Sequence, residues 1–151
     1  MSTSLWNFAL DLYARPGVEQ ACLRLQDEHD TDVCLLLCGA WLQRRGVRCT
    51  ALRAEQLRRL AQGWQGDVIR PLRELRRQWK EQAAQDEALA ALRERLAQLE
   101  LDAERELLRR LEDLSGPWPA EVGGTADWLA ALAGPDADRA ALDCLAAAAR
   151  A

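Results

Sequence analysis

Hydrophobic residues recur every three or four positions along most of the chain, which is the period of an α-helix rather than of a strand. Ala, Leu, Arg, Glu and Gln dominate the composition and β-branched residues are scarce, so the pattern predicts an all-α fold. Polar turns, glycines and prolines divide the pattern into segments. We predict helices over residues 5–14, 16–28, 33–42, 51–62, 67–82, 86–114, 126–133 and 136–150, with a break at 63–66 where two glycines flank Trp64.

Residues 33–42 carry the most informative part of the pattern. They read V-C-L-L-L-C-G-A-W-L and contain no charged residue. A helix that is apolar on every side is buried on every side. Ten helical residues span about 15 Å, which is too short to cross a bilayer, since a membrane-spanning helix needs about 20 residues. We therefore expect a compact helical bundle around a buried central helix at about residues 32–45.

The segment 86–114 predicts a helix that is too long for the rest of the molecule. Its apolar positions step by about 3.6 residues and form one stripe: Leu89, Leu92, Leu96, Leu99, Ala103, Leu107, Leu111 and Leu114. A helix of this length measures about 43 Å, which exceeds the width of a compact domain of this size, so it must overhang, bend or meet a second chain. We expect a protein partner, or self-association, through this helix. Trp118, in a loop flanked by prolines, and Arg109 and Arg110 are the predicted contacts with that partner.

The same pattern divides the chain into regions that we expect to form one domain. Residues 1–82 form a helical core region, and 83–114 form a long amphipathic helix that packs on this region or projects from it. Residues 115–125 form a loop, and 126–151 form a short C-terminal helical pair. At 151 residues the chain has the usual length of one domain and can bury a sizeable core.

Charge is distributed unevenly along the chain. Residues 1–43 hold two arginines against six acidic residues, residues 44–80 hold eleven basic residues against three acidic ones, and residues 81–151 hold seven arginines against fifteen acidic residues. The formal net charge of −4 therefore hides a basic middle segment. Either this segment packs against the acidic helices of its own chain, which is the simpler interpretation, or it binds an anionic partner.

A basic stripe in the middle segment is the best candidate for anionic contacts, and it consists of Arg70, Arg73, Arg77 and Lys80. Tryptophans nearby can stack on bases, so one alternative hypothesis is nucleic-acid binding through residues 44–80. The acidic pI of about 5.1 disfavours this alternative, because nucleic-acid-binding modules are usually basic. Binding to a membrane surface is also disfavoured, because the apolar face of this helix is needed in the core.

The five cysteines lie mostly in or beside apolar runs, where a free cysteine acts as a small hydrophobic residue. Their odd number and irregular spacing do not fit a disulfide framework. The first residues carry no positive charge ahead of an apolar stretch, so we expect no secretory signal and a reducing, cytoplasmic setting. A second alternative is a small metal or thiol-redox protein that uses Cys22, Cys34 and Cys38, with His29 nearby.

An acidic turn separates the second and third predicted helices. It contains Asp27, Asp30 and Asp32, but it lacks the glycine and the distal glutamate of a calcium-binding loop. We interpret it as a solvated turn in which Thr31 or Asp32 caps the following helix.

The residues needed for catalysis are poorly supplied. His29 is the only histidine, serine occurs only at positions 2, 4 and 115, and no Gly-rich phosphate loop follows a strand. A nucleophilic cysteine needs an electropositive and partly open setting, which the apolar run at 33–42 does not offer. We therefore expect no catalytic residue, no metal and no cofactor. The leading hypothesis is a non-enzymatic interaction protein, an adaptor or a regulator.

Three blocks in the N-terminal part carry a family resemblance: Trp6–Val18, Ala21–Asp27 and Asp32–Leu42, followed by a weaker block at Asp67–Arg77. With these blocks, residues 5–80 resemble an uncharacterised family of small proteobacterial proteins, described only as a conserved domain of unknown function. The resemblance implies a cytoplasmic helical protein and brings no activity, cofactor or catalytic residue with it.

Overall fold

The computed structural model describes residues 3–29, 31–121, 127–134 and 137–150, except for the side chains of Glu28 and His29. Within these ranges the secondary structure is helical apart from an isolated antiparallel bridge between Val47 and Ala120. The predicted all-α fold is confirmed. The helices are α1 (Leu5–Tyr13), α2 (Val18–His29), α3 (Val33–Arg44), α4 (Ala51–Trp64), the π-helical turn η1 (Gln65–Ile69), α5 (Arg70–Gln78), α6 (Lys80–Ala83), α7 (Glu87–Ser115), α8 (Trp128–Ala133) and α9 (Arg139–Arg150).

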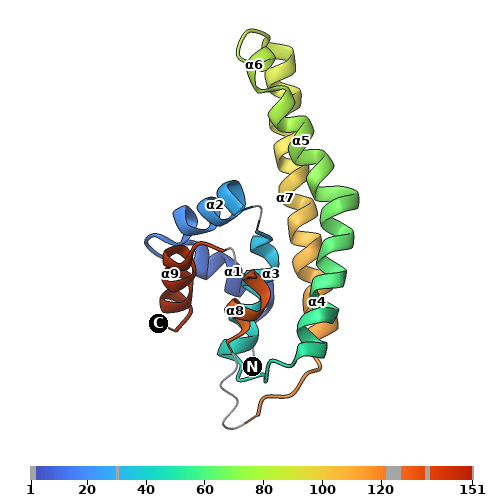
Figure 1. Cartoon of the computed structure of the whole chain (residues 1–151). Helices are drawn as coiled ribbons and strands as arrows, with labels where there is room; N and C mark the ends of the chain where they lie inside the picture. Colours follow the sequence, from blue (N-terminus) through green and yellow to red (C-terminus); the bar gives the residue numbers. More distant parts are fainter. Residues whose placement is uncertain (1–2, 30, 122–126, 135–136, 151) are drawn as a thin grey trace.

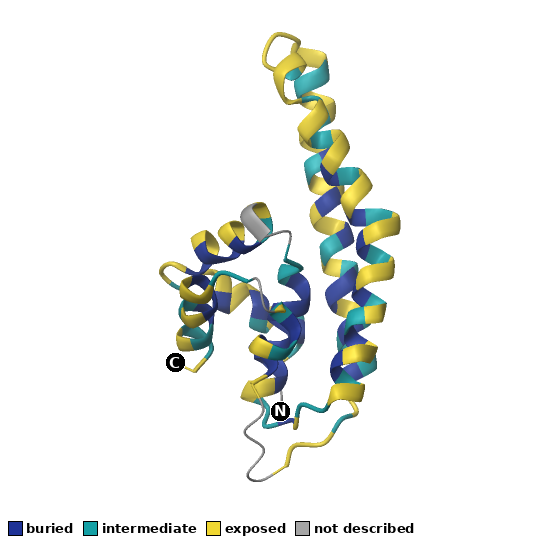
Figure 2. Cartoon of the chain, viewed as in Figure 1, coloured by how far each residue is buried: buried dark blue, intermediate teal, exposed yellow. Residues whose placement is uncertain are grey.

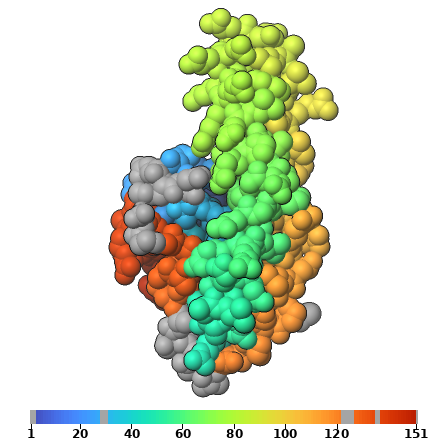
Figure 3. Space-filling view, turned by 45° about the vertical axis from the view of Figure 1, so that its right-hand side comes forward, coloured from blue at the N-terminus to red at the C-terminus, as the bar shows by residue number. Residues whose placement is uncertain are grey.

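The helices are arranged as a body and a long helical hairpin (Figure 1). In the hairpin, α4, η1 and α5 follow one another as one rod, α6 lies at its tip, and α7 returns beside them. The body consists of α1, α2, α3, α8 and α9 and packs against the half of the hairpin that is far from α6. The other half projects beyond the body, as the space-filling view also shows (Figure 3).

The central helix of the body is α3. Asp32 caps its N-terminus, because its side-chain Oδ1 accepts a hydrogen bond of 3.1 Å from the backbone N–H of Leu35. Every residue from Cys34 to Leu42 is buried (Figure 2). α3 packs against α1, α7, α8 and α9, which explains why it carries no polar face. The prediction of a buried central helix is confirmed.

The long helix α7 overhangs the body. Asp86 caps it by accepting a hydrogen bond from the backbone N–H of Leu89, and the helix continues for 29 residues. Its C-terminal half supplies Ala103, Leu107, Leu108 and Leu111 to the main core; its N-terminal half packs against α5 and α6, outside that core. Of the three arrangements that the sequence left open, the structure has the overhang, and α4 to α6 of the same chain cover one side of it.

Two predicted boundaries are wrong in detail. Helical structure runs through the expected break at 63–66, because η1 joins α4 to α5. Pro71 lacks a backbone N–H, and in a regular α-helix its ring collides with the carbonyl four residues earlier; a wider π-turn just before it avoids that collision. The short C-terminal helix begins at Trp128 rather than at 126, because the carboxylate of Asp127 accepts a capping hydrogen bond from the backbone N–H of Ala130.

Candidate functional site

A buried ion network joins α5 to α7. The guanidinium of Arg73 pairs with Glu104 at 3.3 Å and with Glu100 at 3.5 Å. Arg76 donates two hydrogen bonds to Glu100, of 2.8 and 3.3 Å. The side chains of Arg73 and Glu100 are only 10% and 8% exposed, and Arg73 Nε has an ion-pair contact with Glu100 but no hydrogen-bond partner among the described residues. This network fixes how α5 and α7 are aligned, because each buried charge needs its partner.

The predicted basic stripe is therefore divided between the interior and the surface. Arg73 lies inside and pairs with acidic residues of its own chain, as the simpler interpretation of the basic segment predicts. Arg77 lies at the surface and pairs with Asp27 of α2 at 3.3 Å, whereas Arg70 and Lys80 are exposed. Contact of this stripe with an external anion stays a prediction.

Trp118, the first predicted contact with a protein partner, packs against its own chain. Its ring stacks on that of Trp128 with a centroid distance of 6.1 Å and an interplanar angle of 10°. The guanidinium of Arg53 lies 5.2 Å from its centroid. Trp118, in the loop after α7, is therefore half-buried against α8 and α4.

Arg109 and Arg110 lie on the surface of α7 beside the body. Arg109 pairs with Glu106 at 2.7 Å and with Asp113 at 2.8 Å, one turn away in each direction. Arg110 pairs with Glu106 at 2.9 Å and places its guanidinium 3.9 Å from the ring centroid of Trp64. These two arginines help to keep the pKa of Glu106 at about 2. Their contact with a partner stays a prediction.

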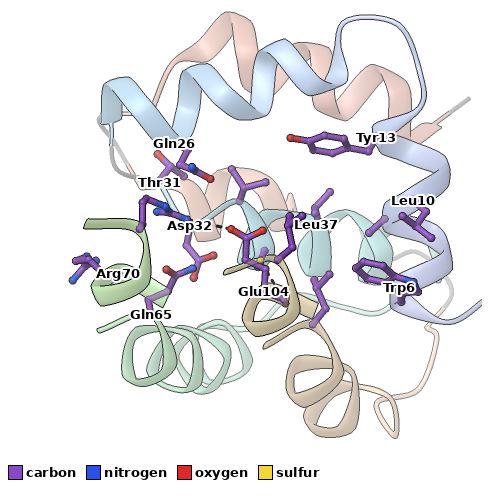
Figure 4. A pocket seen from close by; sticks show the side chains of 16 residues that line it. Trp6, Leu10, Tyr13, Gln26, Thr31, Asp32, Leu37, Gln65, Arg70 and Glu104 are labelled. Carbon is purple, nitrogen blue, oxygen red and sulfur yellow. Dashed lines mark hydrogen bonds and ion pairs between the residues drawn. The ribbon is translucent and has the colours of Figure 1, made fainter. Parts of the chain in front are cut away.

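A cavity of about 240 Å³ lies where α1, the start of α3, η1, α5 and α7 meet (Figure 4). Its two ends differ in character. Glu104 lies between a polar end and an apolar end that includes Trp6 and Leu10. The polar end presents Gln26, Thr31, Asp32, Gln65 and Arg70.

The carboxylates of the cavity are electrostatically unusual. Burial raises the pKa of Asp32, although hydrogen bonds from the Leu35 backbone and the Gln65 side chain act in the opposite direction. Burial also raises the pKa of Glu104, against the opposing effect of Arg73. A cavity with apolar walls, a few convergent polar groups and perturbed carboxylates has the character of a small-molecule site.

The three cysteines of the metal or redox alternative are buried. Burial raises the pKa of Cys22 and of Cys38 to about 12 and raises that of Cys34 well above its usual value. The thiol of Cys34 lies in the cavity wall and contacts the backbone carbonyl of Glu104 at 3.9 Å. These thiols stay protonated near neutral pH, and the protonated form is neither a good nucleophile nor a good metal ligand.

Metal binding has no preformed site within the described part of the chain, where no group of three or more histidine, cysteine or acidic side chains is placed to hold an ion. The proposed role of the His29 imidazole beside the cysteines lies outside the described side chains, and Asp30 of the acidic turn lies outside the described residues. Asp32 is the cap of α3, as one of the two predicted candidates.

The projecting half of the hairpin presents exposed leucines. Leu92 and Leu99 are 50% and 51% exposed and lie seven residues apart on α7, hence on one side of it. We call this pair the α7 outer face. The sequence placed both residues in one apolar stripe with Leu96, which is buried. The structure instead buries Leu96, Glu100 and Ala103, so a glutamate occupies the position in the seam that a leucine was expected to fill.

The sequence analysis missed the cavity and the buried network. A signal for the network was present, because Glu100 falls between Leu96 and Ala103 at the spacing of an inward-facing position. No signal for the cavity was present, since its walls come from helices that are far apart in the sequence.

Among the described helices, none combines the length and the apolar character that a membrane crossing requires. A family model described as "Protein of unknown function (DUF2390)" matches residues 4–111, which include the cavity and the hairpin. The resemblance to a family of unknown function is confirmed, and the match extends beyond the residues 5–80 that carried it. No curated protein and no solved structure matches the chain.

Proposed function

The chain belongs to the DUF2390 family of proteins of unknown function, and on this premise we propose that it is a non-enzymatic interaction protein whose projecting hairpin binds a protein partner. We place this function in the cytoplasm, where the five free cysteines remain reduced. We propose the role of an adaptor or a regulator, because the projecting hairpin has features of a binding surface rather than of a catalytic site.

The observation that carries the proposal is the α7 outer face on a hairpin that extends beyond the core. Burying a leucine side chain contributes about 1.5–3 kcal/mol. A partner that covers the two half-exposed leucines of the projecting helix therefore gains part of this free energy from each. A two-helix hairpin buries only the seam between its helices and leaves its other sides exposed. An amphipathic helix of a partner protein, laid along α7, covers Leu92 and Leu99 by the usual spacing of apolar anchors.

The alternative of nucleic-acid binding has weaker support. Its proposed contact surface needs Arg73 at the surface, whereas the buried network holds Arg73 between Glu100 and Glu104. The metal or redox alternative needs ionised thiols, and burial raises the pKa of all three of its cysteines.

Affinity capture with the full chain tests the proposal. The wild type, the double variant Leu92→Glu/Leu99→Glu and the control Leu52→Glu are used as baits in a nuclease-treated extract of the native host, with identification by mass spectrometry. Leu52 is 70% exposed on α4, so its variant carries the same kind of change away from the α7 outer face. We expect one protein that is retained by the wild type and the control but is lost at least tenfold with the double variant.

Light scattering on the same three proteins tests whether a second copy of this chain, rather than another protein, covers the α7 outer face. A wild-type dimer that becomes monomeric only in the double variant shows that the partner is a second copy of this chain. A monomeric wild type whose captured proteins are the same for all three baits contradicts the proposal.

A further inference from the structure

The cavity between the body and the hairpin is a separate feature from the α7 outer face. One wall comes from α1, with Trp6 and Leu10, and the opposite wall from α5 and α7, with Arg73 and Glu104. Asp32, just before α3, lies at the polar end beside Thr31 (Figure 4). The walls of the cavity therefore come from parts of the chain that lie far apart in the sequence.

The mouth of the cavity is apolar and open to solvent. Leu10, Tyr13 and Leu101 are 49%, 36% and 55% exposed, and all three line this one cavity. Deeper in the wall, Leu37 and Leu108 are buried. An apolar molecule that enters here therefore covers exposed leucine surface at the mouth and contacts buried leucines inside, which is how small-molecule sites gain most of their affinity.

The polar end is lined by the carboxylates of Asp32 and Glu104 and by the guanidinium groups of Arg70 and Arg73. In the buried network, Arg73 and Arg76 balance Glu100 and Glu104, and Asp32 adds a further acidic group to the cavity wall. Arg73 already serves two carboxylates, so its charge is engaged before any ligand arrives.

Glu104 keeps an acceptor for a ligand. Its Oε1 accepts the hydrogen bond from Arg73, whereas its Oε2 accepts none from the side chains and backbone that the structure describes. Arg70 of α5 also lines the polar end and already has an interaction of its own. Glu104 therefore lines the cavity with a spare acceptor, and Asp32 lines it with a carboxylate that caps α3; burial disfavours the charge of both. A positive group between them removes that cost.

We propose that this cavity binds a small primary amine with an apolar body, its ammonium group held by Asp32 and Glu104 and its body lying between Trp6, Leu10 and Leu101. A primary ammonium carries three donors, which suits two carboxylates and one further acceptor. At about 240 Å³ the cavity lies just below the range of about 300–1,000 Å³ that is usual for ligand pockets, which suits a small ligand. The ligand class is therefore that of arylalkyl amines and short alkyl amines rather than of lipids or nucleotides.

Three probes that share one apolar body separate charge from shape. We use 2-phenylethylamine, the neutral 2-phenylethanol and the anionic 3-phenylpropionate, each titrated into the full wild-type chain at pH 7 and followed by two-dimensional amide NMR. We expect saturable shifts for the amine at residues lining the cavity, with an affinity at least tenfold above those of the alcohol and the acid. Equal or tighter binding of the acid overturns the proposal, and so does an amine titration that does not saturate.

Variants test the assigned residues. Glu104→Gln keeps the shape and removes the charge, and Glu94→Gln is its control on the exposed, projecting part of the same helix. We expect at least tenfold weaker amine binding for Glu104→Gln and no change for Glu94→Gln. Because Glu104→Gln also alters the buried network, Leu10→Lys at the mouth and Leu52→Lys on α4 provide a second pair, both at exposed positions. Binding that survives both Glu104→Gln and Leu10→Lys contradicts the assignment.

Discussion

Arg73 and Arg77 lie one helical turn apart on α5 and belong to the same stripe in the sequence, yet they occupy different surroundings. Arg73 is buried between two glutamates of α7, and Arg77 pairs with Asp27 where both side chains are more than half exposed. A buried charge that loses its partner keeps its full desolvation cost, whereas an exposed pair is weakened by water and salt. The two arginines should therefore differ in their contribution to stability.

We expect Arg73→Ala to lower the free energy of unfolding by about 3–5 kcal/mol, because Glu100 and Glu104 then share an interior with one cation fewer. Arg77→Ala should change it by less than about 1 kcal/mol. Urea unfolding followed by circular dichroism measures both values. Similar losses for the two variants contradict the assigned burial, and retention on heparin that falls only with Arg77→Ala supports an anion-binding role for the exposed residue.

Thiol reactivity gives a second prediction at this scale. The pKa of about 12 for Cys22 and Cys38 lowers their thiolate fraction at pH 8 by roughly a thousandfold relative to a free thiol, and burial also raises the pKa of Cys34. Iodoacetamide at pH 8 should therefore modify Cys49 and Cys144, which are partly exposed, long before the three buried thiols.

Peptide mass spectrometry identifies the modified cysteines, and guanidinium provides the control in which all five react. Early modification of Cys34 or Cys38 in the folded chain contradicts their burial and revives the thiol-redox alternative.

At the scale of single residues, the sequence pattern predicted the buried helix α3 and two candidates for its cap, but it did not predict the buried charges. The cap by Asp32 was predictable, because a capping side chain bonds to a backbone N–H only three residues further along the chain. The burial of Arg73 depends on which part of α7 lies opposite it, and that alignment depends on the length of the turn around α6. No local pattern contains this information.

At the scale of the helices, α3 and α8 pack closely at Gly39, and replacing this glycine with alanine tests the contact. An added Cβ on Gly39 of α3 lies 2.8 Å from Leu132 Cδ1 and 3.3 Å from Trp128 Cβ, both on the buried side of α8. Gly63, near the end of α4, has no atom within 4 Å of the same position. One glycine allows two helices to approach, and the other only weakens its helix.

We expect Gly39→Ala to lower the free energy of unfolding by about 1–3 kcal/mol through overpacking, since Leu132 can move but the backbone beside Trp128 cannot. Gly63→Ala should raise it by about 0.5–1 kcal/mol, because alanine favours the helix and meets no neighbour. Thermal and urea unfolding of both variants measure the signs. A stabilised Gly39→Ala variant shows that α3 and α8 are not in contact as described.

The existence of the helices was predictable and their joints were not. The all-α class, the central helix and the length of α7 follow from composition and from a period that every segment repeats. The continuous rod of α4, η1 and α5 was not predictable, because two glycines and a proline usually indicate a break. The cavity was also beyond reach, since its walls are brought together only by the packing of the body on the hairpin.

The molecule as a whole separates into a body that carries the core and a hairpin tip that does not. The main core cluster contains no residue between Leu72 and Ala103, although this entire stretch is described and Leu96 is buried within it. The tip is therefore held by its own seam and by the charges of α5 and α7. This division places the cavity at the junction and the α7 outer face on the tip.

Shortening the hairpin tests whether the two proposed sites are independent. Replacing residues 78–95 with a short Gly-rich linker removes α6 and Leu92 but keeps Arg73, Arg76 and Glu100. Because none of the deleted residues belongs to the main core, we expect one cooperative urea transition and unchanged amide NMR shifts for α3. Titration with 2-phenylethylamine should be unaffected, whereas capture of the protein partner should be lost.

The opposite pattern carries a definite meaning. If shortening the tip unfolds the body, the seam between α5 and α7 stabilises the whole molecule. The projecting hairpin then has a structural role, and the exposure of Leu92 and Leu99 does not indicate a binding surface. If the shortened chain stays folded and still captures the same partner, the contact lies outside residues 78–95, where Leu99, Trp118, Arg109 and Arg110 are the remaining candidates.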